Sequence, residues 1–153
     1  MSDPQLQFSS LFDAEQALEQ LARGAVTAGD GGWNWAQTLI HCAQSIEYSM
    51  HGFPRSKGRL FQGTVGAAAF AVFRRRGRMN HGLTEPIPGA PALDAGADPD
   101  QALARLRGAI RAFREWGGPL QPHFAYGALD HGQYELAHAM HLANHLSAFS
   151  AAR

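Results

Sequence analysis

Histidines are concentrated near the end of the chain, in a stretch whose spacing suits metal binding. Residues 138–145 read HAMHLANH and hold three of the eight histidines in the sequence. On a helix that turns about 100° per residue, His138, His141 and His145 share one face. His141 and His145 are four residues apart, which places their Cβ atoms about 5–6 Å from each other, so both rings can turn toward one ion. Neutral imidazoles suit zinc, nickel, iron or copper, so this pair predicts two ligands of a divalent metal site.

A third ligand must come from another segment, and His41 is the natural candidate, although a carboxylate on a neighbouring helix would also serve. His41 lies in the segment 34–51, where Glu47 is the only charged residue, and Glu135 is the only one in the body of the segment that contains HAMHLANH. Helices so poor in charge are usually buried on most sides, so two of them can turn their polar sectors toward one cleft. A plainer alternative stays open here, because rings at this spacing can also be solvated or hydrogen-bonded to nearby Tyr and Ser side chains.

Helical periodicity predicts an all-α fold with four or five helical segments and no strand. The first helix begins at Asp13, which can form a capping box with Gln16, and it ends near Gly24. The third segment is rich in small residues that allow close helix approach. Residues 77–97 contain three prolines and four glycines, which predicts a long irregular loop that is either a covering segment or a mobile one. The expected helical segments are 13–24, 34–51, 59–76, 98–116 and 130–151.

Length and composition predict one folded domain over residues 1–153. Hydrophobic residues make up 45% of the chain, and thirteen basic residues balance thirteen acidic ones, which argues against nucleic acid or an anionic membrane as a partner. The single cysteine, Cys42, excludes an internal disulfide and suits a reducing compartment. The start, MSDPQLQFSS, lacks the features of a signal peptide, and the longest apolar stretch is too short to span a bilayer. We therefore expect a cytoplasmic protein.

Three longer stretches resemble a known group of proteins. The sequences WNWAQTLIHCAQSIEYSMHGFP, GLTEPIPGAP and PHFAYGALDHGQYELAHAMHLANHLSAF are similar to a bacterial subfamily, of unknown function, of the DinB/YfiT-like superfamily, and the likeness covers nearly the whole chain. The resemblance implies a four-helix bundle in which three histidines hold a divalent metal at one end. By the same resemblance His41, His141 and His145 are the ligand positions. His138 falls outside that pattern and is expected to support the site or to compete as a ligand.

Further candidates share the sectors of these histidines or lie near them. Tyr48, Tyr134 and His138 are placed to orient water or substrate, or else to pack. His123, in PHFAYG, either reaches the mouth of the cleft or has a loop or capping role. Cys42 adjoins His41, but neighbours on a helix diverge by about 100°, so Cys42 is read as a core residue. PIPGAP, residues 86–91, is expected to form a rigid loop that walls one side of the cleft. Trp33, Trp35 and Trp116 lie at helix ends and are expected to pack there.

A set of three neutral histidines predicts a catalytic rather than a purely structural metal site, because at least one coordination position stays open. The ion, expected to be zinc, nickel or iron, can lower the pKa of a bound water or hold a thiolate. This favours a metal-dependent hydrolase or a transferase acting on a small molecule or a low-molecular-weight thiol. The alternative is a non-catalytic, dimeric helical protein with a binding or structural role. In that case the histidines are satisfied internally and small residues such as Gly66 to Ala69 pack between protomers.

Overall fold

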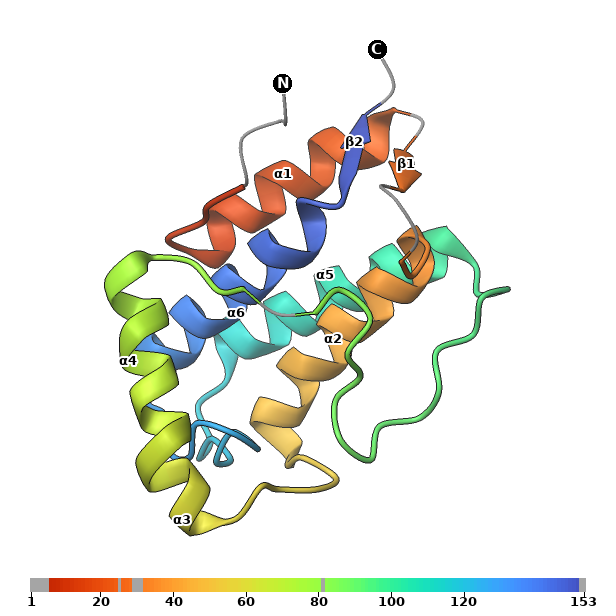
Figure 1. Ribbon diagram of the computed structural model, residues 1–153. Coiled ribbons are helices and arrows are strands. Elements are labelled where there is room, and N and C mark those ends of the chain that lie inside the picture. The colour runs from red at the N-terminus through yellow and green to blue at the C-terminus, as the bar shows by residue number, and fades with distance from the viewer. Residues whose placement is uncertain (1–5, 25, 29–31, 81, 152–153) are drawn as a thin grey trace.

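The computed structural model describes residues 6–24, 26–28, 32–80 and 82–151, and within them the chain is predominantly helical (Figure 1). No helix in these ranges is long and apolar enough to cross a membrane. The elements in chain order are α1 (Leu11–Arg23), β1 (Val26–Ala28), α2 (Trp35–His51), α3 (Arg59–Phe61), the π-helix η1 (Gln62–Gly66), α4 (Ala67–Arg76), α5 (Pro99–Glu115), α6 (His131–Leu146) and β2 (Phe149–Ala151).

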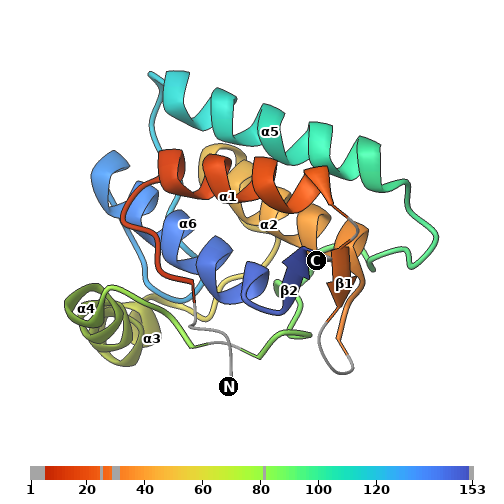
Figure 2. The same cartoon turned by 90° about the horizontal axis from the view of Figure 1, so that it is seen from above.

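Four helices pack around a common core. Helix α2 lies against α5 and α6, and α1 lies against α6 (Figure 2). Burying a side chain of Leu, Ile or Phe size stabilises a fold by about 1.5–3 kcal/mol, so the apolar stripes of these helices hold them together. The fully buried side chains of this core include Leu18, Leu39, Ile46, Leu106, Ile110, Phe113, Leu142 and Leu146.

The two helices that carry the predicted ligands begin at capping boxes. The side chain of Asn34 accepts a hydrogen bond from the backbone N–H of Gln37, and the backbone N–H of Asn34 donates to the side chain of Gln37. Asp130 and Gln133 form the same pair of hydrogen bonds at the start of α6. Such a cap is worth about 1 kcal/mol and fixes where the helix begins. The starts of α2 and of α5, which Asp98 caps, confirm the sequence predictions for these helices.

Two predictions about helix ends are wrong. The first helix begins at Leu11, because the Ser10 side chain caps it, while the Asp13 carboxylate accepts hydrogen bonds from the backbone and hydroxyl of Ser9. This earlier start buries Leu11 completely. The last helix ends at Leu146, because the following residues form strand β2, which pairs antiparallel with β1. Strands of three residues are too short to show an alternating pattern, and these two are far apart in sequence.

The third helical segment forms an arm to one side of the other helices (Figure 2). This arm, residues 59–76, is helical as predicted, but it contains the π-helix η1. The small residue Gly66 does allow a close approach, although to a loop rather than to a helix. A Cβ atom at Gly66 would lie 1.7 Å from the carbonyl oxygen of Ala125, so the loop 123–127 rests directly on the backbone of the arm.

The contact at Gly66 gives a paired stability prediction. Gly66→Ala is expected to lower the free energy of unfolding by about 1–3 kcal/mol, because the added methyl group forces the arm away from Ala125. Gly66 has an ordinary helical φ of −65°, so the effect is steric rather than conformational. Gly63→Ala is the matched control, since a Cβ there meets nothing within 4 Å and alanine favours the helix. Urea unfolding of both variants tests this, and equal stabilities would contradict it.

The loop after the arm is irregular, as predicted, and it covers the molecule. Gly77, with φ of 72°, ends α4 in the left-handed conformation. Two of the loop's own side chains, Met79 and Ile87, are buried. The far end of the loop is tied to the start of α2, where the side chain of Asn34 donates to the carbonyl of Ala95. Of the two alternatives open for this segment, the structure favours the covering one.

Candidate metal centre

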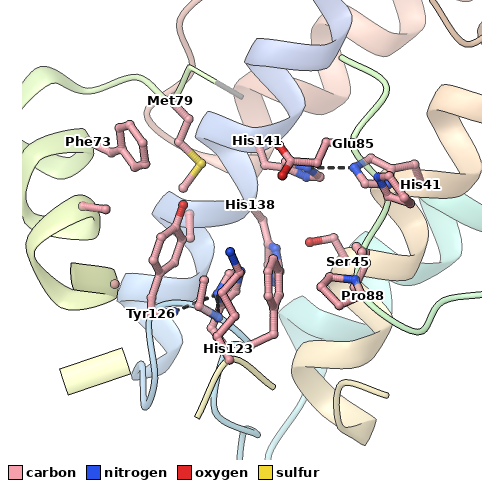
Figure 3. A pocket seen from close by; sticks show the side chains of 18 of the residues that line it. His41, Ser45, Phe73, Met79, Glu85, Pro88, His123, Tyr126, His138 and His141 are labelled. Carbon is pink, nitrogen blue, oxygen red and sulfur yellow. Dashed lines mark hydrogen bonds between the residues drawn. The ribbon is translucent and has the colours of Figure 1, made fainter. Parts of the chain in front are cut away.

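The structure brings the three predicted ligand histidines together. His41 comes from the middle of α2, and His141 and His145 come from successive turns of α6. The Nε2 atoms of His41 and His141 lie 3.1 Å apart, and one ligand nitrogen from each of the three rings lies within 4.8 Å of the others. His41 and His145 are buried and His141 is half-buried. Figure 3 shows His41 and His141 facing each other between the two helices.

Helix geometry explains this convergence. On α2 the core side chains Leu39, Ala43 and Ile46 form a buried stripe, and His41 lies off that stripe on the side that meets α6. On α6 the core takes Leu142 and Leu146, each one residue after a histidine and so turned by about 100° from it. The same packing that buries the aliphatic stripes therefore turns the histidine sectors of both helices toward each other.

The donor set fits a borderline transition-metal ion. A tetrahedral zinc ion with bonds of about 2.0–2.1 Å separates its nitrogen ligands by about 3.3 Å, close to the 3.1 Å between His41 and His141. The group of three contains no carboxylate, which argues against calcium or magnesium, since these ions require oxygen ligands. The three nitrogens lie within 4.8 Å of one another, so the rings would turn toward a bound ion to reach the spacing of a tetrahedral site.

Trp33 covers this cluster, a role that the sequence does not predict. Its ring stacks on His145 at 6.1 Å between centroids with an interplanar angle of 17°, and it lies 4.8 Å from the ring of His41. Trp33 precedes Asn34, the cap of α2, and its sequence position predicts only packing at a helix end. Trp33 lies before the first turn of α2, so helical spacing does not place it on the face of His41, and its contact with the cluster could not be predicted from local pattern. Trp33 limits the contact of His41 and His145 with water.

A cavity of about 300 Å³ opens beside the three histidines and runs along α6 to Ala137. His138 and His123 line it, as does the segment Pro86–Pro88, so the first half of PIPGAP forms part of the wall that was predicted. The structure does not bring Tyr48 or Tyr134 to the lining. Tyr48 packs on Phe53, and the hydroxyl of the buried Tyr134 donates to the carbonyl of Gln121. The Tyr134 ring also stacks on His138, which lines the cavity, so the structure favours the packing alternative for both tyrosines.

Cys42, as expected, is a core residue. It is buried, and burial raises the pKa of its thiol, so it is not a nucleophile for the cavity.

His138 is a neutral neighbour of the cluster. Its Nε2 lies 3.1 Å from Ser49 Oγ, and the Ser49 hydroxyl donates its only hydrogen to the carbonyl of Ile46. The His138 Nε2 must therefore donate, which fixes the tautomer of the ring. Burial, and next the charge of His131, lower the pKa of His138 to about 3. This nitrogen is occupied, so the structure favours a supporting role over a competing ligand.

The lowered pKa of His138 predicts acid sensitivity. Between the ordinary value of 6.5 and about 3, the unfolded chain binds a proton at this position and the folded chain does not. The free energy of unfolding should thus be highest above pH 6.5 and fall toward pH 3, with His138 contributing up to about 1.4 kcal/mol per pH unit. His138→Gln should make this decline shallower in urea unfolding from pH 7 to 4. A decline that is equally steep in His138→Gln and in the unmodified protein would contradict the assignment.

His123 both organises a loop and lines the cavity, the two roles proposed for it from the sequence. Its Nδ1 accepts hydrogen bonds from the backbone N–H groups of Ala125 and Tyr126, so the neutral ring carries its proton on Nε2. The ring stacks on Tyr126 at 4.2 Å. His123 therefore shapes the turn 123–127, which supports the arm, and it also lines the end of the cavity remote from His145.

Comparison with known proteins identifies one family. No curated protein and no solved structure matches the sequence. A match to the family described as "Protein of unknown function (DUF1569)" covers residues 1–152. Because this match spans almost the entire sequence, the chain belongs to the DUF1569 family.

Proposed function

We propose that this protein is a DinB-like four-helix bundle that binds one divalent transition-metal ion through His41, His141 and His145, and that it is a metal-dependent enzyme. The observation that carries the proposal is the convergence of these histidines beside a cavity large enough for a small molecule. A closed structural site would use a fourth protein ligand, whereas this group offers three neutral nitrogens next to open space.

Different residues would have different roles in such a site. The three imidazoles would hold zinc, nickel or iron, and Trp33 would keep water from one side of the cluster. The metal would supply Lewis acidity, which lowers the pKa of a coordinated water or thiol. The cavity would hold and orient the substrate, with His138 and His123 as neutral groups of fixed tautomer in its wall. These features suit a hydrolase or a transferase that uses a small thiol.

A reaction screen tests the catalytic part of the proposal. Metal-loaded protein is assayed for hydrolysis of esters and amides and for conjugation of small thiols to electrophiles. We expect turnover in one of these classes that is lost after chelation and in His141→Ala, and retained in the control His51→Ala. Turnover that survives chelation would contradict the metal-dependent mechanism, and a stoichiometrically loaded protein with no turnover in either class would contradict the proposed enzyme.

The rival function, a non-catalytic dimeric protein, is favoured by one observation. Leu60, Val65 and Val72 are exposed on the arm, with exposed fractions of 82%, 60% and 46%, and such side chains can pack between two protomers. The contact between His41 and His141 would then satisfy these rings without an ion. Sedimentation analysis with and without chelator separates the two. The rival predicts a dimer, no stoichiometric metal and unchanged thermal stability.

A further inference from the structure

We propose that the cavity selects an elongated small molecule with an apolar body and a terminal carboxylate, and that Lys57 binds this carboxylate. The inference rests on the proposed metal centre, since the opposite end of the ligand would present its metal-binding group to the three histidines. It adds a substrate class and a specificity residue to that site. Three features of the cavity support it: its length, the composition of its walls and the placement of its charges.

The lining of the cavity extends along α6, and its two ends differ chemically. Its lining follows α6 from His145 to Ala137, two turns of helix, or about 12 Å at 1.5 Å per residue. The three-histidine group lies at the His145 end. At the other end the backbone N–H of Lys57 donates to the carbonyl of Phe124, which places Lys57 beside the turn that His123 organises. A ligand that reaches from one end to the other therefore has two functional groups separated by a spacer.

The walls between these ends are apolar. The arm contributes Phe61, Val65 and Phe73, and the covering loop contributes Met79 and Ile87. The lining histidines come from α2, α6 and the turn 123–127, so the cavity has an apolar face and a polar face. An aromatic or branched aliphatic spacer would bury its surface against the arm, whereas a purely polar ligand would leave these walls without a favourable contact.

The charges of the cavity lie at different places along it. Lys57 is the only lysine of the chain, and its Nζ lies 5.0 Å from the centroid of the Phe61 ring. Among the described residues, no ion pair involves Lys57. Glu85, from the covering loop, is the one acidic residue of the described lining, and Lys57 is the one Lys or Arg residue in it. Lys57 is therefore the side chain of the lining best suited to bind an anionic ligand group.

Binding of three related thiols to the cobalt-loaded protein tests the inference, with the cobalt–sulfur absorption band as the readout. The probes are 2-mercaptoethanol, benzyl mercaptan and 4-(mercaptomethyl)benzoate. We expect benzyl mercaptan to bind about tenfold more tightly than 2-mercaptoethanol, because its ring is buried against the arm. The carboxylate should add a further gain of roughly threefold that shrinks with added salt.

Matched variants assign each gain to its residue. Val65→Ala and Phe73→Ala should reduce the preference for the aromatic probe, while Val72→Ala, on the same arm but outside the lining, should not. Lys57→Gln should remove only the gain from the carboxylate, and the nearby exposed Arg59→Gln should preserve it. Equal affinities for the three probes, or a carboxylate gain that survives Lys57→Gln, would overturn this inference while leaving the metal centre intact. Failure of the protein to bind cobalt would overturn both.

Discussion

Replacing His141, His145 or His41 by alanine is expected to reduce the affinity for zinc by more than about 100-fold, because losing a residue that merely orients a ligand already costs 10–100-fold. Each variant removes one of three nitrogens that lie within 4.8 Å of one another. Water can replace the lost ligand, but it adds neither the basicity nor the fixed position of an imidazole. Competition with a chromophoric chelator measures the affinity, and far-ultraviolet circular dichroism verifies that each variant is folded.

The control for these variants lies on the same helix. His51→Ala removes an exposed histidine at the end of α2 and should leave the affinity for zinc unchanged. His138→Gln is a more demanding comparison, because His138 lies in the same cavity but outside the group of three. We expect His138→Gln to lose less affinity for zinc than the three alanine variants of the ligands. Undiminished zinc binding in all three alanine variants would show that the cluster is not the site.

Removing the metal is expected to lower the thermal stability of the protein substantially. The ion would join α2 to α6 through residues separated by 100 positions in the sequence, and such a link exists only in the folded chain. A ligand specific for the folded state stabilises it by about 2.7 kcal/mol at 100 times its Kd and by about 4.1 kcal/mol at 1,000 times. For a domain of this size the corresponding increase in Tm is roughly 5–15 °C.

Calorimetry of metal-loaded and chelator-dialysed protein measures this difference. In His141→Ala the two preparations should have the same Tm, which separates a specific effect of the metal from a general effect of the chelator. A Tm that is unchanged by metal removal in the unmodified protein would favour the rival interpretation, in which the histidines satisfy one another.

Much of the helical structure could be predicted from the sequence. Helices α2 and α5 follow from apolar residues at helical spacing and from strong capping residues at Asn34 and Asp98, which are local signals. The start of α1 was misplaced because Ser10 and Asp13 are both good caps, and only the burial of Leu11 decides between them. The pair β1 and β2 could not be predicted, since three-residue strands gain their stability from a partner more than a hundred residues away.

The candidate site, like the fold, could be predicted where it depends on local sequence. The spacing of His141 and His145 on a helix is a local property, whereas the choice of His41 depended on the low charge of its helix and on the resemblance to a known superfamily. The roles of Trp33, Lys57 and the arm were not accessible, because they depend on how separate segments are placed in space. The position of Tyr134 on its helix suggested a role in the site, but its hydroxyl donates to the backbone carbonyl of Gln121 instead.

Elemental analysis of the purified protein tests the central claim most directly. The protein should be prepared without a histidine tag or a nickel column, since such a resin could load the site itself. We predict about one zinc, nickel or iron ion per chain, as expected for a three-histidine site, and its loss in a variant with His41, His141 and His145 all replaced by alanine. Only trace amounts of transition metal, at equal levels in both proteins, would contradict the account.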